Sequence, residues 1–190
     1  MIIACLGDIL TYGYGVGRPQ TWCALASALT GHAFVNRGVN GALSDEIAAQ
    51  PFDGADEIFA LGGLNDLFLG RDVRVPLEQM RLLCRKAADR GVSPTVGIPM
   101  QIAPDVDEAW CDGPVDIARV RAAYAAYAEG LLLQCRRDGV RTLDLRPVIL
   151  PGHLAFDGIH LNGEGHRRMA EAVAALWPRP GNVPPREERP

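Results

Sequence analysis

The chain has 190 residues, of which 48% are hydrophobic and 22% are charged, and its formal net charge is −4. This length suggests a single domain that can bury a substantial apolar core. The acidic balance argues against a nucleic-acid partner, because nucleic-acid binders more often carry a basic face. No apolar run approaches the roughly 18 residues needed to cross a membrane, so we expect no membrane partner.

The first residues, Met1–Gly7, have no basic n-region and are more typical of a strand than of a signal peptide. We therefore expect a cytoplasmic protein. The five cysteines form no CxxC pair, which favours reduced and mostly buried thiols. The four histidines are scattered and none lies at metal-ligand spacing from a cysteine, so we expect no metal and no cofactor.

Apolar runs alternate with amphipathic segments along the chain. In chain order we expect a strand over Ile2–Leu6, a helix over Trp22–Leu29, a strand over Ala33–Asn36, a helix over Leu43–Gln50, a strand over Glu57–Leu61, a helix over Val75–Arg90, a strand over Thr95–Ile98, a helix over Val115–Arg137, a strand over Arg141–Leu145 and a helix over Gly163–Leu176. A glycine or proline follows each of these helices within two residues, as is usual where a helix ends.

This alternation of strands and helices predicts a five-stranded parallel sheet with helices on both faces, a three-layer α/β/α sandwich. Ligands of such sheets bind beyond the carboxyl ends of the strands. We expect one domain over residues 1–177, followed by a Pro-rich, flexible tail over residues 178–190. The oligomeric state is left open by the sequence.

Four polar segments lie where the expected strands end or just before the last helix. The first is Gly7–Gly13, the second Asn36–Gly41, the third Gly63–Asp66 and the fourth Asp157–His160. The first three follow consecutive strands, and the carboxyl ends of parallel strands meet at one edge of a sheet. These segments are therefore the candidates for a functional site.

The fourth segment carries an acid–base pair. Asp157 lies three residues before His160, so that in a tight turn its carboxylate can accept a hydrogen bond from the imidazole. Such a carboxylate orients the ring and stabilises the imidazolium when the histidine takes a proton. His153 and His166 lie in no such pattern, and we expect structural or surface roles for them.

Taken together and in this order, the four segments resemble those of the SGNH (GDSL) hydrolase family, and the resemblance covers Ile2–Trp177. It implies the flavodoxin-like topology of that family and an esterase, lipase or thioesterase acting on carboxylic esters. It also implies an oxyanion hole made by the backbone N–H of Ile9, the backbone N–H of Gly38 and the side-chain amide of Asn65. Such donors stabilise the negative charge that develops during acyl transfer.

Two acidic residues of these segments, Asp8 and Asp66, are expected to have structural roles. A carboxylate in a turn can accept hydrogen bonds from nearby backbone amides. We therefore expect both to brace their turns rather than to take part directly in catalysis.

The chain departs from the family pattern at the residue that matters most, because Ile9 occupies the position of the nucleophilic serine. Isoleucine has no labile proton and no lone pair, so it cannot attack a carbonyl. Its backbone N–H remains, but its branched side chain would fill the space of the acyl carbon. Loss of the nucleophile costs serine hydrolases on the order of 10⁶ in kcat, so the chain as written should be nearly inactive.

Three explanations for Ile9 stay open. Ile9 can be a single substitution of a native serine, since one base change converts a serine codon into an isoleucine codon. The protein can be a natural pseudoenzyme that still binds an ester, an acyl chain or a sugar. It can also use a rearranged mechanism, although Thr11 lies two positions on and does not face the same way as residue 9 in a helix.

The specificity of such a site comes from the loops beyond the strands. The candidate wall residues are Tyr12, Tyr14, Leu67, Phe68, Met100 and Trp110. These side chains are mostly apolar and suit a small-molecule ester or acyl substrate. The main hypothesis is therefore an SGNH-type ester hydrolase that lacks its nucleophile, and the alternative is a pseudoenzyme that binds an acyl or sugar ligand without turnover.

Overall fold

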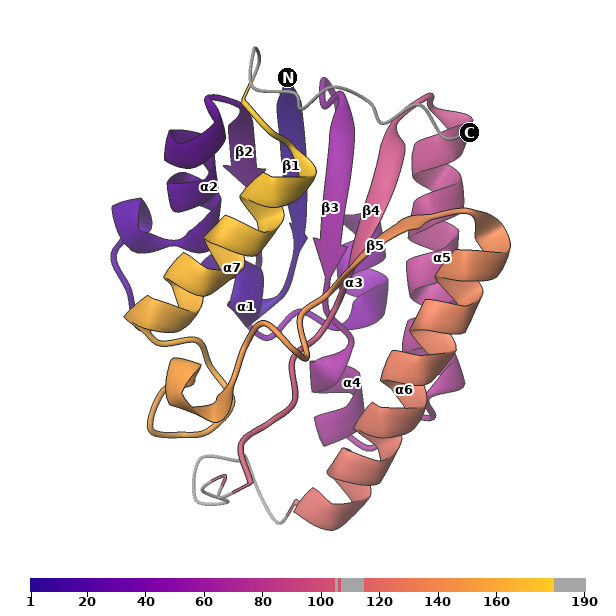
Figure 1. Cartoon of the computed structure of the whole chain (residues 1–190). Coiled ribbons are helices and arrows are strands. Elements are labelled where there is room, and N and C mark those ends of the chain that lie inside the picture. Colours follow the sequence, from indigo (N-terminus) through magenta and orange to yellow (C-terminus); the bar gives the residue numbers. More distant parts are fainter. Residues whose placement is uncertain (105, 107–114, 180–190) are drawn as a thin grey trace, which may run out of the picture.

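The structure is a computed structural model and describes residues 1–104, 106 and 115–179. Five parallel strands form one sheet in the order β2-β1-β3-β4-β5 (Figure 1). The strands are β1 (Ile2–Gly7), β2 (Ala33–Asn36), β3 (Glu57–Leu61), β4 (Ser93–Ile98) and β5 (Arg141–Asp144). The helices are α1 (Ile9–Tyr12), α2 (Trp22–Thr30), α3 (Ser44–Ala49), α4 (Leu64–Phe68), α5 (Arg74–Asp89), α6 (Ile117–Asp138) and α7 (Gly163–Leu176), with short 3₁₀ turns η1 (Arg18–Gln20) and η3 (Pro151–His153).

Two apolar cores lie on opposite faces of the sheet. Successive β1 residues alternate between them, with Ala4 and Leu6 in one core and Ile3 and Cys5 in the other, as the period of a strand requires. Helices α3, α4, α5 and α6 cover the first face, and α1, α2 and α7 cover the second. The predicted three-layer α/β/α fold with a five-stranded parallel sheet is confirmed.

The observed elements agree with the expected ones to within about two residues at each end, which is the usual uncertainty of helix ends. Two short helices, α1 and α4, were not anticipated. They follow β1 and β3 directly and have four and five residues, too few to show a helical repeat of apolar positions. Both of them lie at the carboxyl edge of the sheet and shape the site described below.

Four of the cysteines, Cys5, Cys23, Cys84 and Cys135, lie in the described residues, and all four are free and buried. This agrees with the expectation of reduced, buried thiols. Among the described residues, no helix is both long and apolar enough to span a membrane.

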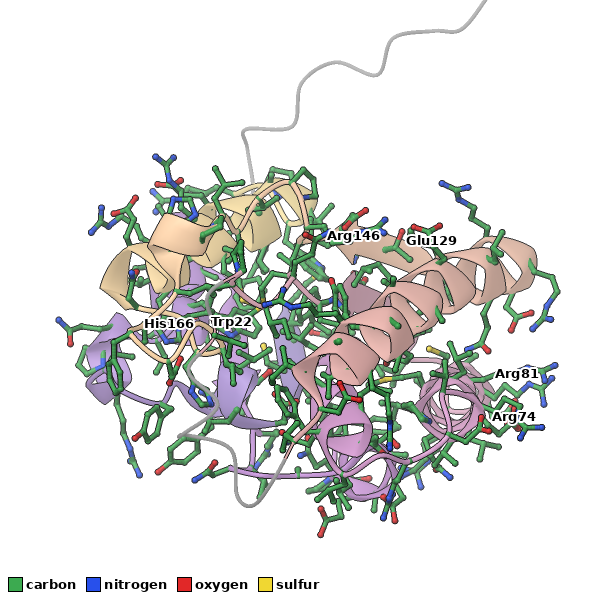
Figure 2. The ribbon with its side chains drawn as sticks, turned by 90° about the horizontal axis from the view of Figure 1, so that it is seen from below. Trp22, Arg74, Arg81, Glu129, Arg146 and His166 are labelled. Carbon is green, nitrogen blue, oxygen red and sulfur yellow. The ribbon has the colours of Figure 1, made fainter. Side chains whose placement is uncertain are left out.

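A buried histidine joins the two helices of the second face. His166 of α7 is 1% exposed, and its Nδ1 accepts a hydrogen bond of 3.2 Å from the backbone N–H of Trp22, the first residue of α2 (Figure 2). Burial lowers the pKa of His166 from 6.5 to about 4, because the charged ring would lose its hydration. His166 is therefore a structural residue that is neutral in the folded protein.

Replacement of His166 should change how stability depends on pH. Because folding lowers the pKa of His166, its neutral form stabilises the fold above about pH 6.5, and this contribution is lost as the pH falls toward 4. Asparagine at this position keeps a hydrogen-bond acceptor but does not titrate. The difference in free energy of unfolding between wild type and His166→Asn should therefore shrink by up to roughly 3 kcal/mol over that range. Urea unfolding at several pH values measures it, and a difference that does not vary with pH would contradict the assignment.

Candidate active site

The loop after β1 is held by a buried glutamine. Gln50 accepts a hydrogen bond of 2.9 Å from the Gly7 N–H through Oε1 and donates one of 2.8 Å to the Gly7 carbonyl through Nε2. Asp8 then caps α1 by accepting a hydrogen bond of 3.0 Å from the Leu10 N–H. Ile9 is the first residue of α1, and within the described part of the chain its N–H has no acceptor. The backbone at Ile9 is thus fixed, and its N–H is free of any acceptor among the described residues.

Asp157 and His160 form the pair that the sequence predicts. Asp157 is 3% exposed, and its Oδ1 accepts hydrogen bonds from the Ile159 N–H at 2.9 Å and the His160 N–H at 3.0 Å. Its Oδ2 lies 2.6 Å from His160 Nδ1. This contact places the proton of the neutral ring on Nδ1 and leaves Nε2 as the acceptor.

The ionisation of Asp157 follows from these contacts. Burial opposes the negative charge, but the hydrogen bonds from the His160 ring and from the two backbone amides outweigh it and hold the pKa of the Asp157 carboxyl below its usual range. Asp157 is therefore a carboxylate at neutral pH, which is the form that orients an imidazole and stabilises its charge. Among the described residues, His160 Nε2 has no hydrogen-bond partner, so it is available to a ligand.

The turn that carries this pair rests on the segment after β4. The Ala103 N–H donates a hydrogen bond of 2.7 Å to the carbonyl of Gly158, the residue between Asp157 and Ile159. Gly158 has a φ of +71°, and a Cβ there would lie 2.9 Å from that of Ala103. Glycine is thus required at this position both by its backbone conformation and by the close approach of the supporting segment.

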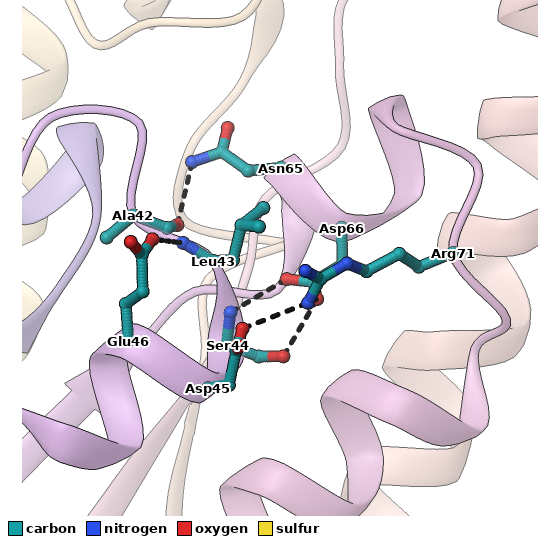
Figure 3. Close-up of polar contacts among 8 residues, drawn as sticks. All are labelled: Ala42, Leu43, Ser44, Asp45, Glu46, Asn65, Asp66 and Arg71. Atoms are coloured by element: carbon teal, nitrogen blue, oxygen red, sulfur yellow. Dashed lines mark hydrogen bonds and ion pairs between the residues drawn. The ribbon is translucent and has the colours of Figure 1, made fainter.

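A network of polar contacts joins the third segment to the residues between the second segment and the start of α3 (Figure 3). The fully buried Asp66 accepts hydrogen bonds from the Ser44 N–H at 2.9 Å and the Ser44 hydroxyl at 2.8 Å, and it pairs with Arg71 at 3.2 Å. The neighbouring Asn65 donates from Nδ2 to the Ala42 carbonyl at 2.9 Å. Asp66 therefore has the structural role that the sequence predicts, and among the described residues one amide hydrogen of Asn65 has no acceptor.

A cavity of about 280 Å³ lies at this edge of the sheet, between the four segments. Its lining residues are Asp8, Ile9, Leu10, Gly41, Leu43, Leu64, Asn65, Phe68, Leu69, Val115, Ile159 and His160. Ile9, Asn65 and His160 are thus brought together as expected, with Asp157 behind His160. Most of the remaining wall is apolar, so the polar groups of Ile9, Asn65 and His160 lie beside a hydrocarbon surface.

The N–H of Gly38, which we expected among the oxyanion donors, is engaged by a side chain of its own loop. Its N–H donates to Asn36 Oδ1 at 2.9 Å, and a Cβ on Gly38 would lie 2.3 Å from the Tyr12 nitrogen. Gly38 therefore allows the loop after β2 to approach the backbone of α1 rather than a ligand. It lines a separate hollow, whereas Gly41 lines the cavity, and the Gly41 N–H has no acceptor among the described residues.

Of the predicted pocket residues, only Phe68 lines the cavity. Leu67 and Met100 are each 2% exposed and pack in the two cores, because their side chains point into the protein. Tyr12 is exposed and lines the separate hollow beside Gly38. Trp110 lies outside the described residues. These predictions rested on position in the chain, which does not determine the direction of a side chain in a loop or in a helix of only four or five residues.

Several site residues were missed because they belong to short or irregular segments. The apolar wall residues that sequence reasoning did not single out are Leu10, Leu43, Leu64, Leu69, Val115 and Ile159.

Tyr14 was anticipated as a wall residue but instead packs on His160, with ring centroids 5.0 Å apart. Thr11 is fully buried and its hydroxyl lies against Gly7, so it is not placed to attack a ligand in the cavity. Within the described residues, no group of three or more His, Cys, Asp or Glu side chains could hold a metal ion.

Asp8 is the acidic residue of the cavity wall. It is 1% exposed, and burial raises the pKa of its carboxyl to about 7, although the hydrogen bond from the Leu10 N–H partly opposes this shift. Its cap on α1 is the structural role that we expected. Because of this raised pKa, Asp8 gains a proton when the pH falls below about 7.

Solved structures share this fold across nearly the whole chain. A member of the lipolytic G-D-S-L family from Veillonella parvula DSM 2008 is 20% identical, covers 93% of this chain and 98% of its own, and has a TM-score of 0.75. A carbohydrate acetylesterase from Sinorhizobium meliloti is 18% identical, with coverage of 92% and 97% and a TM-score of 0.75. An aryl esterase from M. smegmatis is 15% identical, with coverage of 92% and 97% and a TM-score of 0.74.

Sequence comparison gives a family as well as a fold. No curated protein sequence matches the chain. The model of the GDSL-like lipase/acylhydrolase family matches residues 5–168, which include all four polar segments and the cavity that they enclose. The chain therefore belongs to the GDSL-like lipase/acylhydrolase family.

Proposed function

We propose that the cavity is the ester site of a GDSL-type hydrolase from which only the nucleophile is missing. The observation that carries this proposal is the 2.6 Å contact between Asp157 and His160, at a cavity that also contains Ile9 and Asn65. A base with a free Nε2, an orienting carboxylate and neighbouring amide donors are the groups that acyl transfer needs.

Each group has a defined role in this proposal. His160 Nε2 is the general base, and Asp157 holds the ring and stabilises its charge. The oxyanion donors are the backbone N–H of Ile9, the second amide hydrogen of Asn65 and the backbone N–H of Gly41. Gly41 takes the place that the sequence assigned to Gly38, because the N–H of Gly38 is already bonded to Asn36.

Ile9 leaves this apparatus without an attacking atom. The chain as written binds an ester but forms no acyl-enzyme, and it is nearly inactive as a hydrolase. Because the donors at the site are backbone groups or come from other segments, a single serine would complete the machinery. The presence of Asp157, His160 and Asn65 favours a single substitution of a serine or a recent pseudoenzyme over a rearranged mechanism.

The size of the cavity favours small substrates. A volume of about 280 Å³ lies near the lower end of ligand pockets, which hold roughly 300–1,000 Å³. Its apolar wall suits a short acyl group, and we favour short carboxylic esters over long-chain lipids. The carbohydrate acetylesterase and the aryl esterase of the same fold support this choice of substrate class.

Restoring the serine tests the proposal. Ile9→Ser should hydrolyse p-nitrophenyl acetate with a kcat at least about 10⁴-fold above that of the unchanged chain, because a lost nucleophile costs on the order of 10⁶. Ile9→Ala is the matched control, since it removes the branched side chain without adding a nucleophile. A folded Ile9→Ser protein without activity would overturn the proposal, and equal activity of the serine and alanine variants would show that His160 activates water instead.

The oxyanion role of Asn65 can be tested in the Ile9→Ser background. Adding Asn65→Ala should lower kcat for p-nitrophenyl acetate by about 10²–10³, as loss of one oxyanion donor does in serine hydrolases. Asn40→Ala is the control, because Asn40 is an exposed asparagine of the loop after β2 that does not line the cavity. Unchanged kcat in Asn65→Ala would exclude Asn65 from the oxyanion hole.

A further inference from the structure

The cavity keeps an unusual set of unused hydrogen-bond donors. In the described part of the chain, the backbone N–H groups of Ile9 and Gly41 have no acceptor, and Asn65 uses one of its two amide hydrogens. His160 Nε2, which accepts in the neutral ring and donates in the doubly protonated one, also has no partner among the described residues. In a hydrolase these groups act on a reaction that Ile9 prevents, so in this chain they remain available to a ligand that stays intact.

The chemistry of these groups selects the ligand. Donors that face one cavity require an acceptor with several lone pairs, and a carboxylate has two oxygens with about four acceptor positions. His160 lines the same cavity, and an imidazole with a proton on both nitrogens donates to two carboxylates at once, here to Asp157 through Nδ1 and to a ligand through Nε2. A neutral ester offers one carbonyl oxygen and gains no such charge interaction.

The rest of the wall selects what is attached to that carboxylate. Leu43, Leu64 and Phe68 line the cavity together with the side chain of Ile9, which adds apolar surface where a serine would add a hydroxyl. Extending the proposed function to the chain as it stands, we propose that this cavity is a receptor site for a short, unbranched monocarboxylic acid. The carboxylate lies among the donors of Ile9, Gly41, Asn65 and His160, and the hydrocarbon chain lies against the apolar wall.

The charges around the cavity are compatible with an anion. Asp157 and Asp66 are committed, the first to His160 and the second to Ser44 and Arg71. Asp8 is the acid that lines the cavity, and burial raises its pKa to about 7. Below that pH Asp8 carries a proton and no longer repels a carboxylate, whereas the ligand itself, with a pKa near that of a glutamate side chain at about 4.3, remains ionised. Binding should therefore be tighter at pH 6 than at pH 8.

Calorimetric titration of the unchanged protein with hexanoate tests this inference. At pH 6, hexanoate should bind at least about tenfold more tightly than 1-hexanol or hexanamide, which have the same chain length but no negative charge. His160→Gln and Asn65→Ala should each weaken hexanoate about tenfold or more, and Asn40→Ala should not change it. The His160 side chain is 21% exposed, so we expect His160→Gln to disturb the packing of the fold little. Circular dichroism checks that each variant folds.

Two results would overturn the inference. Equal affinity for hexanoate and 1-hexanol, or no binding of hexanoate, would show that the cavity does not recognise a carboxylate. Hexanoate binding that is unaffected by both His160→Gln and Asn65→Ala would place the acid elsewhere. These results are distinct from the test of the proposed function, because hydrolysis by Ile9→Ser can succeed while the unchanged chain ignores hexanoate.

Discussion

Parallel pairing of β1 with β2 on one side and β3 on the other determines where the site can form. The register aligns Cys5 with Asn36 and Gly7 with Leu61, so the loops after these three strands leave the sheet next to one another. The fourth segment reaches the same edge from the turn before α7, where Ala103 supports it. Every group of the cavity depends on this arrangement, because no two of the four segments are adjacent in the sequence.

Buried carboxylates hold these loops in shape. Asp8 caps α1, Asp66 binds the backbone and side chain of Ser44, and Asp157 binds two amides of its own turn as well as His160. A buried carboxylate without such partners would be strongly destabilising. Each acid therefore stabilises the one loop conformation in which its hydrogen bonds are made. Asp8 and Asp157 differ in their ionisation, because burial raises the pKa of Asp8 to about 7 whereas the hydrogen bonds from His160 and from two backbone amides hold the pKa of Asp157 below its usual range.

This construction explains why the change at Ile9 is local. The position contributes its backbone N–H through the start of α1, and the Asp8 cap and the hydrogen bonds of Gln50 to Gly7 hold that backbone whatever the side chain is. In the proposed function, isoleucine in place of serine removes the attacking oxygen and adds apolar surface, while Asn65 and Gly41 remain at the cavity. The proposal thus separates binding at this cavity from the covalent step.

The sequence by itself determined the order of strands and helices, the fold class and the Asp157–His160 pair, because these depend on apolar periodicity and on short-range spacing. Family resemblance added the positions of Ile9 and Asn65. Only the tertiary structure places Gly41 at the cavity and Gly38 at a separate hollow, because the hydrogen bond of Gly38 to Asn36 and its contact with Tyr12 arise from how two loops pack. It also turned Leu67 and Met100 into the cores and placed Leu43, Leu69 and Val115 around the cavity. In a loop or a helix of only a few residues, the direction of a side chain is set by long-range contacts rather than by a repeating pattern, so the wall of the cavity could not be predicted from the sequence.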